Sequence, residues 1–180
     1  MKKIFLISAT LLCVMVACNN NREKATVSTT EVQQVNTDNN TAKAAAPAAG
    51  LPSFAVQDAS GNLVNLQSFK GKKVFVNLWA TWCPPCRREM PSIEKLSLAT
   101  DTGKVAFVML SLDDHFDKAK KFLQTQKLDL PIYYPAEDLP ELFNVQGIPT
   151  TFIFNEAGVL IRRVDGGDDY NVKAYKTLLK

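Results

Sequence analysis

Apolar residues change their spacing several times along this chain, and each change predicts a boundary between elements. In 74–80 all but one residue is apolar, which is typical of a buried strand. Apolar residues then recur at helical spacing through 87–99, and a second unbroken apolar run follows at 105–110. The pattern predicts a central strand, a helix and a second central strand in succession.

Shorter elements precede and follow this unit. Two short apolar stretches at 54–57 and 63–66 enclose a turn-rich loop, which indicates a hairpin. A second helix is expected to begin at Asp113 or Asp114, either of which can cap it, and to run to about Gln126. The remaining pattern predicts a strand at 130–134, a short helix at 139–143, strands at 151–154 and 159–164, and a closing helix at 169–179.

The order of these elements indicates the fold class. Strands separated by helices pair in parallel, and a late hairpin adds an antiparallel edge. We therefore predict an α/β fold with a central mixed β-sheet, helices on both faces and an N-terminal β-hairpin. With 180 residues, 46% of them hydrophobic, the chain has enough material for one ordinary domain with appendages. A net charge of +3 gives no reason to expect a nucleic-acid partner.

The N-terminal segment has the pattern of an export signal. Two lysines precede an apolar run at 4–16 that is shorter than the roughly 18 residues needed to span a bilayer. We expect residues 1–17 to be removed as a signal peptide. Residues 18–50 are rich in Asn, Thr, Gln and Ala without an apolar period, which predicts a flexible tether before a folded domain at 51–180. Export would place the chain in an oxidising compartment.

Two of the four cysteines, Cys83 and Cys86, lie between the central strand and the helix. A Cys-x-x-Cys pair there indicates a redox couple, because the N–H groups and partial charge of a helix N-terminus favour the nucleophilic thiolate. Three other interpretations compete with this one. A structural disulfide would close too short a loop to stabilise much, and a zinc site needs about four ligands. Inert buried thiols would not need Pro84 and Pro85 between them.

Two segments resemble motifs of the thioredoxin superfamily. Residues 77–91 (NLWATWCPPCRREMP) contain the cysteine pair preceded by Trp, and residues 145–152 (VQGIPTTF) match the segment that carries the family's cis-proline. More narrowly, residues 51–180 are similar to the TlpA/ResA branch of exported, membrane-tethered thiol–disulfide oxidoreductases. The resemblance implies a thioredoxin-like fold. Residues 15–18 also resemble the lipobox of bacterial lipoproteins, with Met15 where Leu is usual, and this implies acylation at Cys18.

The resemblance also implies roles for individual residues. Cys83 would attack a substrate disulfide and Cys86 would resolve the mixed disulfide, so that the two alternate between dithiol and disulfide. Glu89 would carry a proton to or from Cys86; a solvated acid favoured by the helix dipole is the alternative. Asn77 stands where thioredoxins themselves carry a buried, titratable Asp. The residues expected to contact substrate are Trp82, Pro84, Pro85, Ile148 and Pro149, the last through a cis peptide bond.

The expected activity is thiol–disulfide exchange, mainly as a reductase, by a lipid-anchored protein on the periplasmic side of a bacterial membrane. By resemblance, the substrates would be protein disulfides, including oxidised apocytochrome c during cytochrome c-type biogenesis, and the electron donor a membrane thiol carrier of the CcdA/DsbD type. We expect a monomer without a cofactor or metal. Two alternatives stay open: a thiol peroxidase of the AhpC/TSA kind, which would draw on Thr81, and a Sco-like copper-binding module, whose cysteines are one residue further apart.

Overall fold

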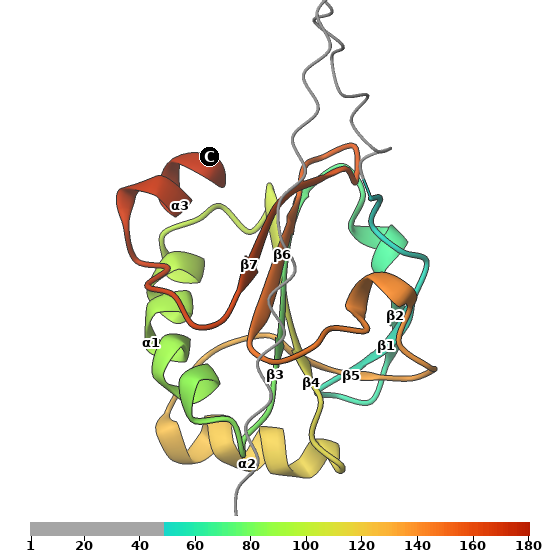
Figure 1. Ribbon diagram of the computed structural model, residues 1–180, viewed down its shortest axis with the longest axis vertical. Helices are drawn as coiled ribbons and strands as arrows, with labels where there is room; N and C mark the ends of the chain where they lie inside the picture. Colours follow the sequence, from blue (N-terminus) through green and yellow to red (C-terminus); the bar gives the residue numbers. More distant parts are fainter. Residues whose placement is uncertain (1–48) are drawn as a thin grey trace, which may run out of the picture. The chain divides into compact units, whose positions relative to one another are not determined.

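The computed structural model describes residues 49–180; the predicted signal peptide, Cys18 and nearly all of the predicted tether lie outside the described residues. The described part contains seven strands, three α-helices and two 3₁₀ helices (Figure 1). In chain order they are β1 (Ala55–Asp58), β2 (Leu63–Asn65), η1 (Leu66–Phe69), β3 (Lys73–Trp79), α1 (Pro84–Leu98), β4 (Val105–Ser111), α2 (Phe116–Gln126), β5 (Ile132–Pro135), η2 (Glu141–Phe143), β6 (Thr150–Phe154), β7 (Leu160–Asp165) and α3 (Lys173–Leu178). None of the helices in this part is both long and apolar enough to cross a bilayer.

One sheet organises the domain, with its strands in the order β2-β1-β5-β4-β3-β6-β7. The neighbours β5, β4 and β3 run parallel, and the strands on either side of them pair antiparallel. The predicted mixed sheet and N-terminal hairpin are confirmed. Because β3 pairs with β4 on one side and β6 on the other, the loop that follows β3 leaves a well-supported part of the sheet.

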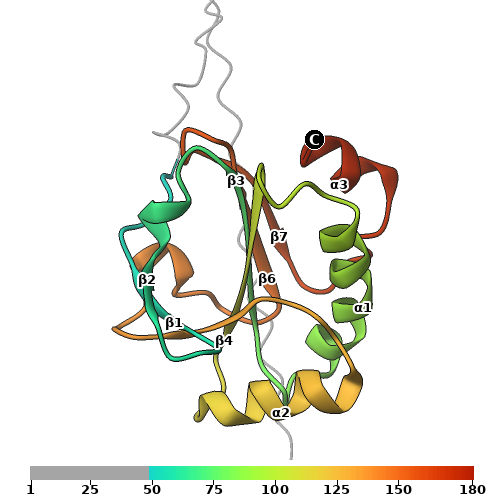
Figure 2. The same ribbon diagram turned by 180° about the vertical axis from the view of Figure 1, so that it is seen from behind.

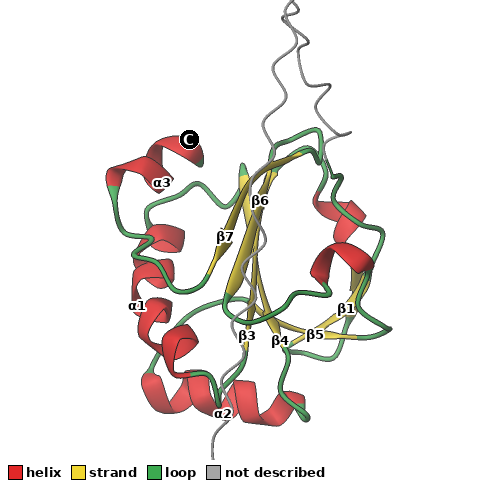
Figure 3. Cartoon of the chain, viewed as in Figure 1, coloured by secondary structure: helices red, strands yellow, loops and turns green. Residues whose placement is uncertain are grey.

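The two faces of the sheet are covered in different ways. All three α-helices of the described part pack on one face, where they share an apolar cluster with β3, β4 and β6. The other face is covered by the chain around β1 and by the two 3₁₀ helices, so the prediction of helices on both faces is met on this face only by 3₁₀ helices. In Figure 1, α1 and α3 lie on the left of the sheet and the β1–β2 hairpin on the right; Figure 2 shows the same layers from behind, and Figure 3 separates them by element type.

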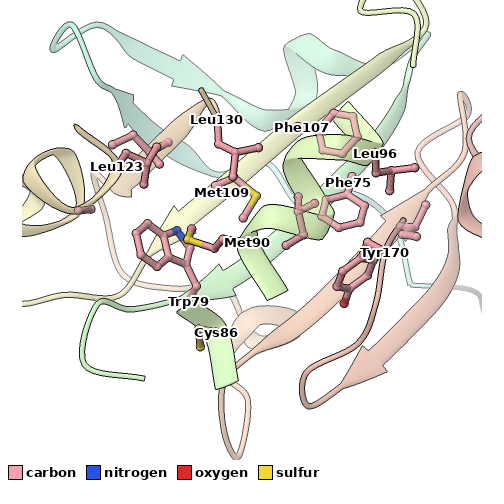
Figure 4. Packing of buried hydrophobic residues seen from close by; sticks show 14 of the residues in the cluster. Phe75, Trp79, Cys86, Met90, Leu96, Phe107, Met109, Leu123, Leu130 and Tyr170 are labelled. Carbon is pink, nitrogen blue, oxygen red and sulfur yellow. The ribbon is translucent and has the colours of Figure 1, made fainter. Parts of the chain in front are cut away.

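Alternation along β3 decides which side chains face the α-helices. Phe75 and Trp79 belong to the cluster under the helices, whereas the residues between them belong to the opposite cluster, Asn77 excepted. A strand places every second side chain on the same face, so Asn77 points toward α1. Figure 4 shows Cys86 and Met90 of α1 in this cluster with Trp79. The redox pair and a buried polar residue of β3 therefore lie on the same side of the sheet.

Helix α2 begins later than the sequence pattern predicts. It follows His115, whose side chain makes no capping hydrogen bond, so the prediction that Asp113 or Asp114 caps this helix is wrong. The Asp113 carboxylate instead accepts hydrogen bonds from Thr81, in the loop after β3.

Helix α3 also begins later than predicted, at Lys173. The side chains of Asp168 and Asp169 accept hydrogen bonds from the backbone N–H groups of Asp169 and Asn171, at 2.7 and 3.0 Å. Such local bonds offer the backbone an alternative to the helix. The chain therefore stays in a loop after β7, and this loop reaches α1.

Candidate active site

The two cysteines form a disulfide at the N-terminus of α1. Cys83 is the N-cap residue of the helix, and its Sγ accepts a hydrogen bond from the Cys86 N–H at 3.2 Å. Cys83 is 3% exposed and Cys86 is fully buried, so a partner sulfur can reach the pair only from the Cys83 side. The structure thus brings the predicted redox pair together where β3 passes into α1.

Pro84 and Pro85 occupy the first two positions of α1. The first four N–H groups of a helix have no partner within it, and they stabilise an anion at the N-terminus. Proline has no N–H, so two of these four donors are missing, and the Cys86 N–H is the donor that reaches Cys83 Sγ. A thiolate at Cys83 is therefore stabilised less than it would be by a full set of helix donors.

Ile148 and Pro149, in the loop before β6, lie beside the redox pair. The peptide bond between them is cis. The carbonyl oxygen of Ile148 lies 3.6 Å from Cys83 Sγ. Pro149 is buried and Ile148 is half-buried. Both residues that the sequence assigns to substrate contact from this loop are therefore next to the predicted nucleophile.

An apolar groove adjoins the redox pair, since Trp82 and Ile148 form two of its walls. Its volume is about 340 Å³, and Trp82 is 65% exposed. The other walls are Leu112, Leu139, Phe143, Asn144, Val145 and Gly147. An exposed aromatic side chain at the mouth of an apolar groove marks a contact surface. The sequence pattern identified Trp82 and Ile148, but it marked residues 139–143 only as a short helix and did not assign them to the groove.

Glu89 lies one turn beyond Cys86 on the buried side of α1. It is 4% exposed, so the alternative of a solvated acid is wrong. Its Oε1 accepts a hydrogen bond from Asn77 Nδ2 at 2.8 Å, and its Oε2 accepts one from the Asp168 N–H at 3.2 Å. Burial raises the pKa of the Glu89 carboxyl to about 7, and these two hydrogen bonds oppose the shift. A carboxyl that titrates near neutral pH can both accept and return a proton.

Asn77 connects Glu89 to a pair of buried hydroxyl groups. Its Nδ2 also donates to Thr151 Oγ1 at 2.9 Å, and Thr151 Oγ1 is hydrogen-bonded to the Tyr170 hydroxyl at 2.7 Å. Burial raises the pKa of Tyr170 well above its ordinary value, and the Glu89 charge adds to the shift, so the hydroxyl keeps its proton. The sequence indicated Asn77 only as a non-titrating replacement. Its direct contact with Glu89 follows from the alternation along β3.

A buried carboxylate holds the loop that carries Trp82 and Cys83. Asp113, just after β4, accepts hydrogen bonds from the Thr81 N–H at 3.1 Å, from Thr81 Oγ1 at 2.6 Å and from Ser111 Oγ at 2.9 Å. This contact is not apparent from the sequence pattern, although the carboxyl ends of parallel neighbours meet at one edge of a sheet. Thr81 Oγ1 donates its hydrogen bond to Asp113 and not to a group at Cys83, which weighs against the peroxidase alternative.

Replacing Asp113 with alanine is expected to destabilise the domain by about 3 kcal/mol, because buried donors lose their acceptor. D113N keeps one acceptor oxygen and is expected to cost roughly half as much. Urea unfolding measures both effects. The matched control is D114A, at the neighbouring exposed position, which is expected to change the unfolding midpoint little. Equal losses at the two positions would contradict the role given to Asp113.

Comparison with known proteins places this site in a family. A model of the Redoxin family matches residues 41–179. The thioredoxin-like protein YneN of Bacillus subtilis is 40% identical over 111 residues, which are 61% of this chain and 65% of YneN. The thiol-disulfide oxidoreductase ResA of Bacillus thuringiensis is 32% identical over 116 residues, 64% of this chain and 67% of ResA. The chain thus spans slightly less than two thirds of YneN and about two thirds of ResA.

A solved structure agrees with this placement. The crystal structure of a thiol:disulfide interchange protein of the thioredoxin family from Chlorobium tepidum TLS is 27% identical to this chain. It covers 75% of this chain and 99% of its own, with a TM-score of 0.61, which confirms the predicted thioredoxin-like fold. The chain belongs to the Redoxin family, and its folded domain is that of a ResA-like thiol–disulfide oxidoreductase of the thioredoxin superfamily.

Proposed function

We propose that this protein works as a reductase, whose Cys83–Cys86 dithiol gives two electrons to a disulfide in an exported protein. The direction of electron transfer is inferred from the Pro84–Pro85 pair at the start of α1, which removes two N–H donors near Cys83. A couple oxidises its partners more strongly when its reduced, thiolate form is better stabilised. With one N–H donated to Cys83 Sγ, this thiolate is stabilised less than it would be by a full set of helix donors, and the dithiol gives up its electrons more readily.

Reduction takes two exchanges at Cys83. The Cys83 thiolate attacks one sulfur of the substrate disulfide; a bond from Cys83 to that sulfur forms, the substrate S–S bond breaks, and the other sulfur leaves as a thiolate. Cys86 then gives its thiol proton to the Glu89 carboxylate and attacks Cys83 Sγ. The Cys83–Cys86 bond forms as the bond to the substrate breaks. The second substrate sulfur also leaves as a thiolate, both substrate thiolates take up protons from water, and the protein is left with the disulfide seen in the structure.

The substrate is held by backbone and by apolar contact. An extended segment can pair with the backbone of Ile148 beside the cis-proline, as strands add to an exposed edge. A side chain next to the substrate cysteine then reaches the groove at Trp82. Pro84 is exposed and Pro85 half-buried beside Cys83, so both can contact the same segment.

Trp82→Ala is expected to raise KM for a peptide disulfide about tenfold, which corresponds to about 1.4 kcal/mol of lost apolar contact. Since Trp82 is largely exposed, the free energy of unfolding is expected to change little. Steady-state kinetics measures the effect. Hydroxyethyl disulfide, which is too small to use the groove, serves as the control substrate. A loss of the same size on both substrates would contradict the role of the groove.

We assign the protein to the periplasmic side of a bacterial membrane, with acylated Cys18 as its anchor. The basic and apolar start of the sequence and the lipobox-like residues 15–18 support this assignment. In an oxidising compartment the disulfide must be reduced again by a dithiol, for which we propose a membrane thiol carrier of the CcdA/DsbD type. The proposed substrate is the oxidised Cys-x-x-Cys-His segment of apocytochrome c.

The equilibrium potential of the Cys83–Cys86 couple, measured against glutathione, tests the proposed direction. We expect a potential of about −270 mV or lower, since about −120 mV is typical of a strong oxidant. The variant P84A/P85A restores both N–H groups and is expected to have a higher potential. A wild-type value above about −180 mV would overturn the reductase assignment.

A further inference from the structure

Glu89 borders a cavity that is separate from the apolar groove. The cavity has a volume of about 390 Å³ and is lined by Pro85, Arg88, Glu89, Gly167, Asp168 and Asp169. The groove at Trp82 and Ile148 shares none of these residues. Arg88, Gly167 and the two aspartates are exposed, so the cavity opens to solvent. A substrate side chain seated in the groove therefore leaves the side of the cavity formed by Arg88, Gly167 and Asp168 open, and only Pro85 at its edge also contacts the substrate segment.

The two carboxylate oxygens of Glu89 have different surroundings. Oε1 faces the interior, where it is held by Asn77, and behind Asn77 lie Thr151 and Tyr170, all of them fully buried. Oε2 accepts its longer hydrogen bond from the Asp168 N–H and lies next to Gly167. On the interior side these partners are all fully buried, whereas the Oε2 side adjoins the cavity.

Gly167 keeps this second side open. A Cβ atom at this position would lie 3.7 Å from Glu89 Oε2 and 3.6 Å from Pro85 Cβ. These are ordinary contact distances, and the backbone of Gly167 is not in the left-handed region, so an alanine fits without strain. Its methyl group would occupy the space between the carboxylate and the wall at Pro85. The missing side chain is therefore what exposes Oε2 to the cavity.

We propose that this cavity is the proton route of Glu89: the proton taken from Cys86 leaves Glu89 through Oε2, past Gly167, while the substrate still covers Cys83. The inference rests on the proposed function, in which Glu89 accepts that proton. The Cys86 S–H bond breaks and a carboxyl O–H bond forms; the Cys83–Cys86 bond then forms as the substrate sulfur leaves as a thiolate. The carboxyl proton passes to water or to a buffer base in the cavity, and Glu89 is a carboxylate again.

The charges around Glu89 suit such a route. Arg88, Asp168 and Asp169 on the rim carry both signs, and Tyr170, behind Asn77, keeps its proton. A small buffer anion can therefore enter without meeting a rim of one charge. Glu89 needs this access because a buried acid that cannot release its proton accepts one only once.

A pH profile gives the first test. Reduced full-length protein is mixed with a peptide disulfide, quenched with acid, and the rate of Cys83–Cys86 bond formation is measured by mass spectrometry. G167A removes solvent from Oε2, so its rate is expected to fall about tenfold at pH 7 and the midpoint of the profile to move to higher pH. The contrasting variant G50A changes a glycine that lines neither the cavity nor the groove, and it is expected to keep the wild-type midpoint.

Chemical rescue gives the second test, with acetate as the probe. In E89A the carboxylate is missing and the cavity can admit acetate. Rising acetate concentration is expected to restore the rate of Cys83–Cys86 bond formation about tenfold. Sodium chloride at equal ionic strength is the control. E89A/G167V is expected to lose this rescue, because the added methyl groups fill the entrance. E89A/G50V, whose second substitution lies outside the cavity and the groove, is expected to keep it.

The outcomes separate the two proposals. If E89A is as fast as wild type, Glu89 carries no proton, and both its proposed role and the route are overturned. If E89A is slow but G167A keeps the wild-type profile and E89A/G167V keeps the rescue, the route is wrong while the role of Glu89 stands. The route is supported if G167A forms the Cys83–Cys86 bond slowly and the midpoint of its pH profile is raised. It also requires that acetate rescue of E89A is lost when G167V is added.

Discussion

Cys83→Ser is expected to slow disulfide exchange by roughly 10³-fold or more, because the only other thiol among the described residues is that of the buried Cys86. Cys83 is the only member of the pair with any exposed surface, and it lies beside the cis-proline and the groove. Cys86 is fully buried and cannot replace it as the first nucleophile. The measurement is reduction of a peptide disulfide by the reduced protein.

Cys86→Ser provides the matched variant, since the two positions differ by one helical turn. It retains the attacking thiolate but lacks the resolving sulfur, so the mixed disulfide between Cys83 and the peptide is expected to accumulate to one equivalent. Mass spectrometry of the intact protein detects this species directly. Equal accumulation in C83S, or turnover in either variant at the wild-type rate, would contradict the order of attack.

Glu89→Gln is expected to slow the resolving exchange by roughly 10²-fold, the usual contribution of a positioned acid or base. Glutamine cannot take the Cys86 proton, although it retains the size of the side chain. Because the pKa of Glu89 is about 7, the wild-type rate should rise through neutral pH as the carboxylate forms, and E89Q should lack this limb. The control is E94Q on the same helix, whose carboxylate accepts a hydrogen bond from Asp129. If E89Q and E94Q changed the pH profile equally, the proposed role of Glu89 would be contradicted.

The same substitution changes how stability depends on pH. The pKa of Glu89 is raised from 4.5 to about 7 in the folded protein, so between these values the folded state holds a proton that the unfolded chain has released. This group therefore makes the free energy of unfolding fall as the pH rises from about 4.5 to 7, by about 3 kcal/mol in all. E89Q is expected to lack this decline in urea unfolding series. A decline of the same size in E89Q would place its origin elsewhere.

Much of the fold follows from apolar spacing alone. The runs at 74–80 and 105–110 predict β3 and β4 nearly at their observed bounds, because strands buried on both faces leave an unbroken apolar pattern. The starts of α2 and α3 do not follow from local pattern. Asp113 can cap a helix or accept hydrogen bonds from a distant loop. It does the latter, because the fold brings Thr81 close to it. Local sequence contains no information about that partner.

The candidate site shows the same division. Cys83 and Cys86 are recognisable because their spacing is itself the chemistry of the site. The role of Pro149 is recognisable only from the resemblance of residues 145–152 to the family motif. Asn77 and Asp168 are not recognisable as partners of Glu89, since they come from β3 and from the loop after β7. Only the pairing of β3 and the course of that loop bring the three together. The burial that raises the pKa of Glu89 is likewise a property of the assembled layers.

The central claim is that Cys83 is a nucleophile made moderately acidic by the start of α1. The most direct measurement is a titration of thiolate absorbance at 240 nm in the reduced C86S variant, in which Cys83 is the only thiol of the redox pair. We predict a midpoint clearly below about 8.5, the value of a free cysteine, and well above about 3.5, the value of the most oxidising members of the superfamily. A midpoint at or above 8.5 would contradict thiolate activation by the helix, and one near 3.5 would contradict the reductase.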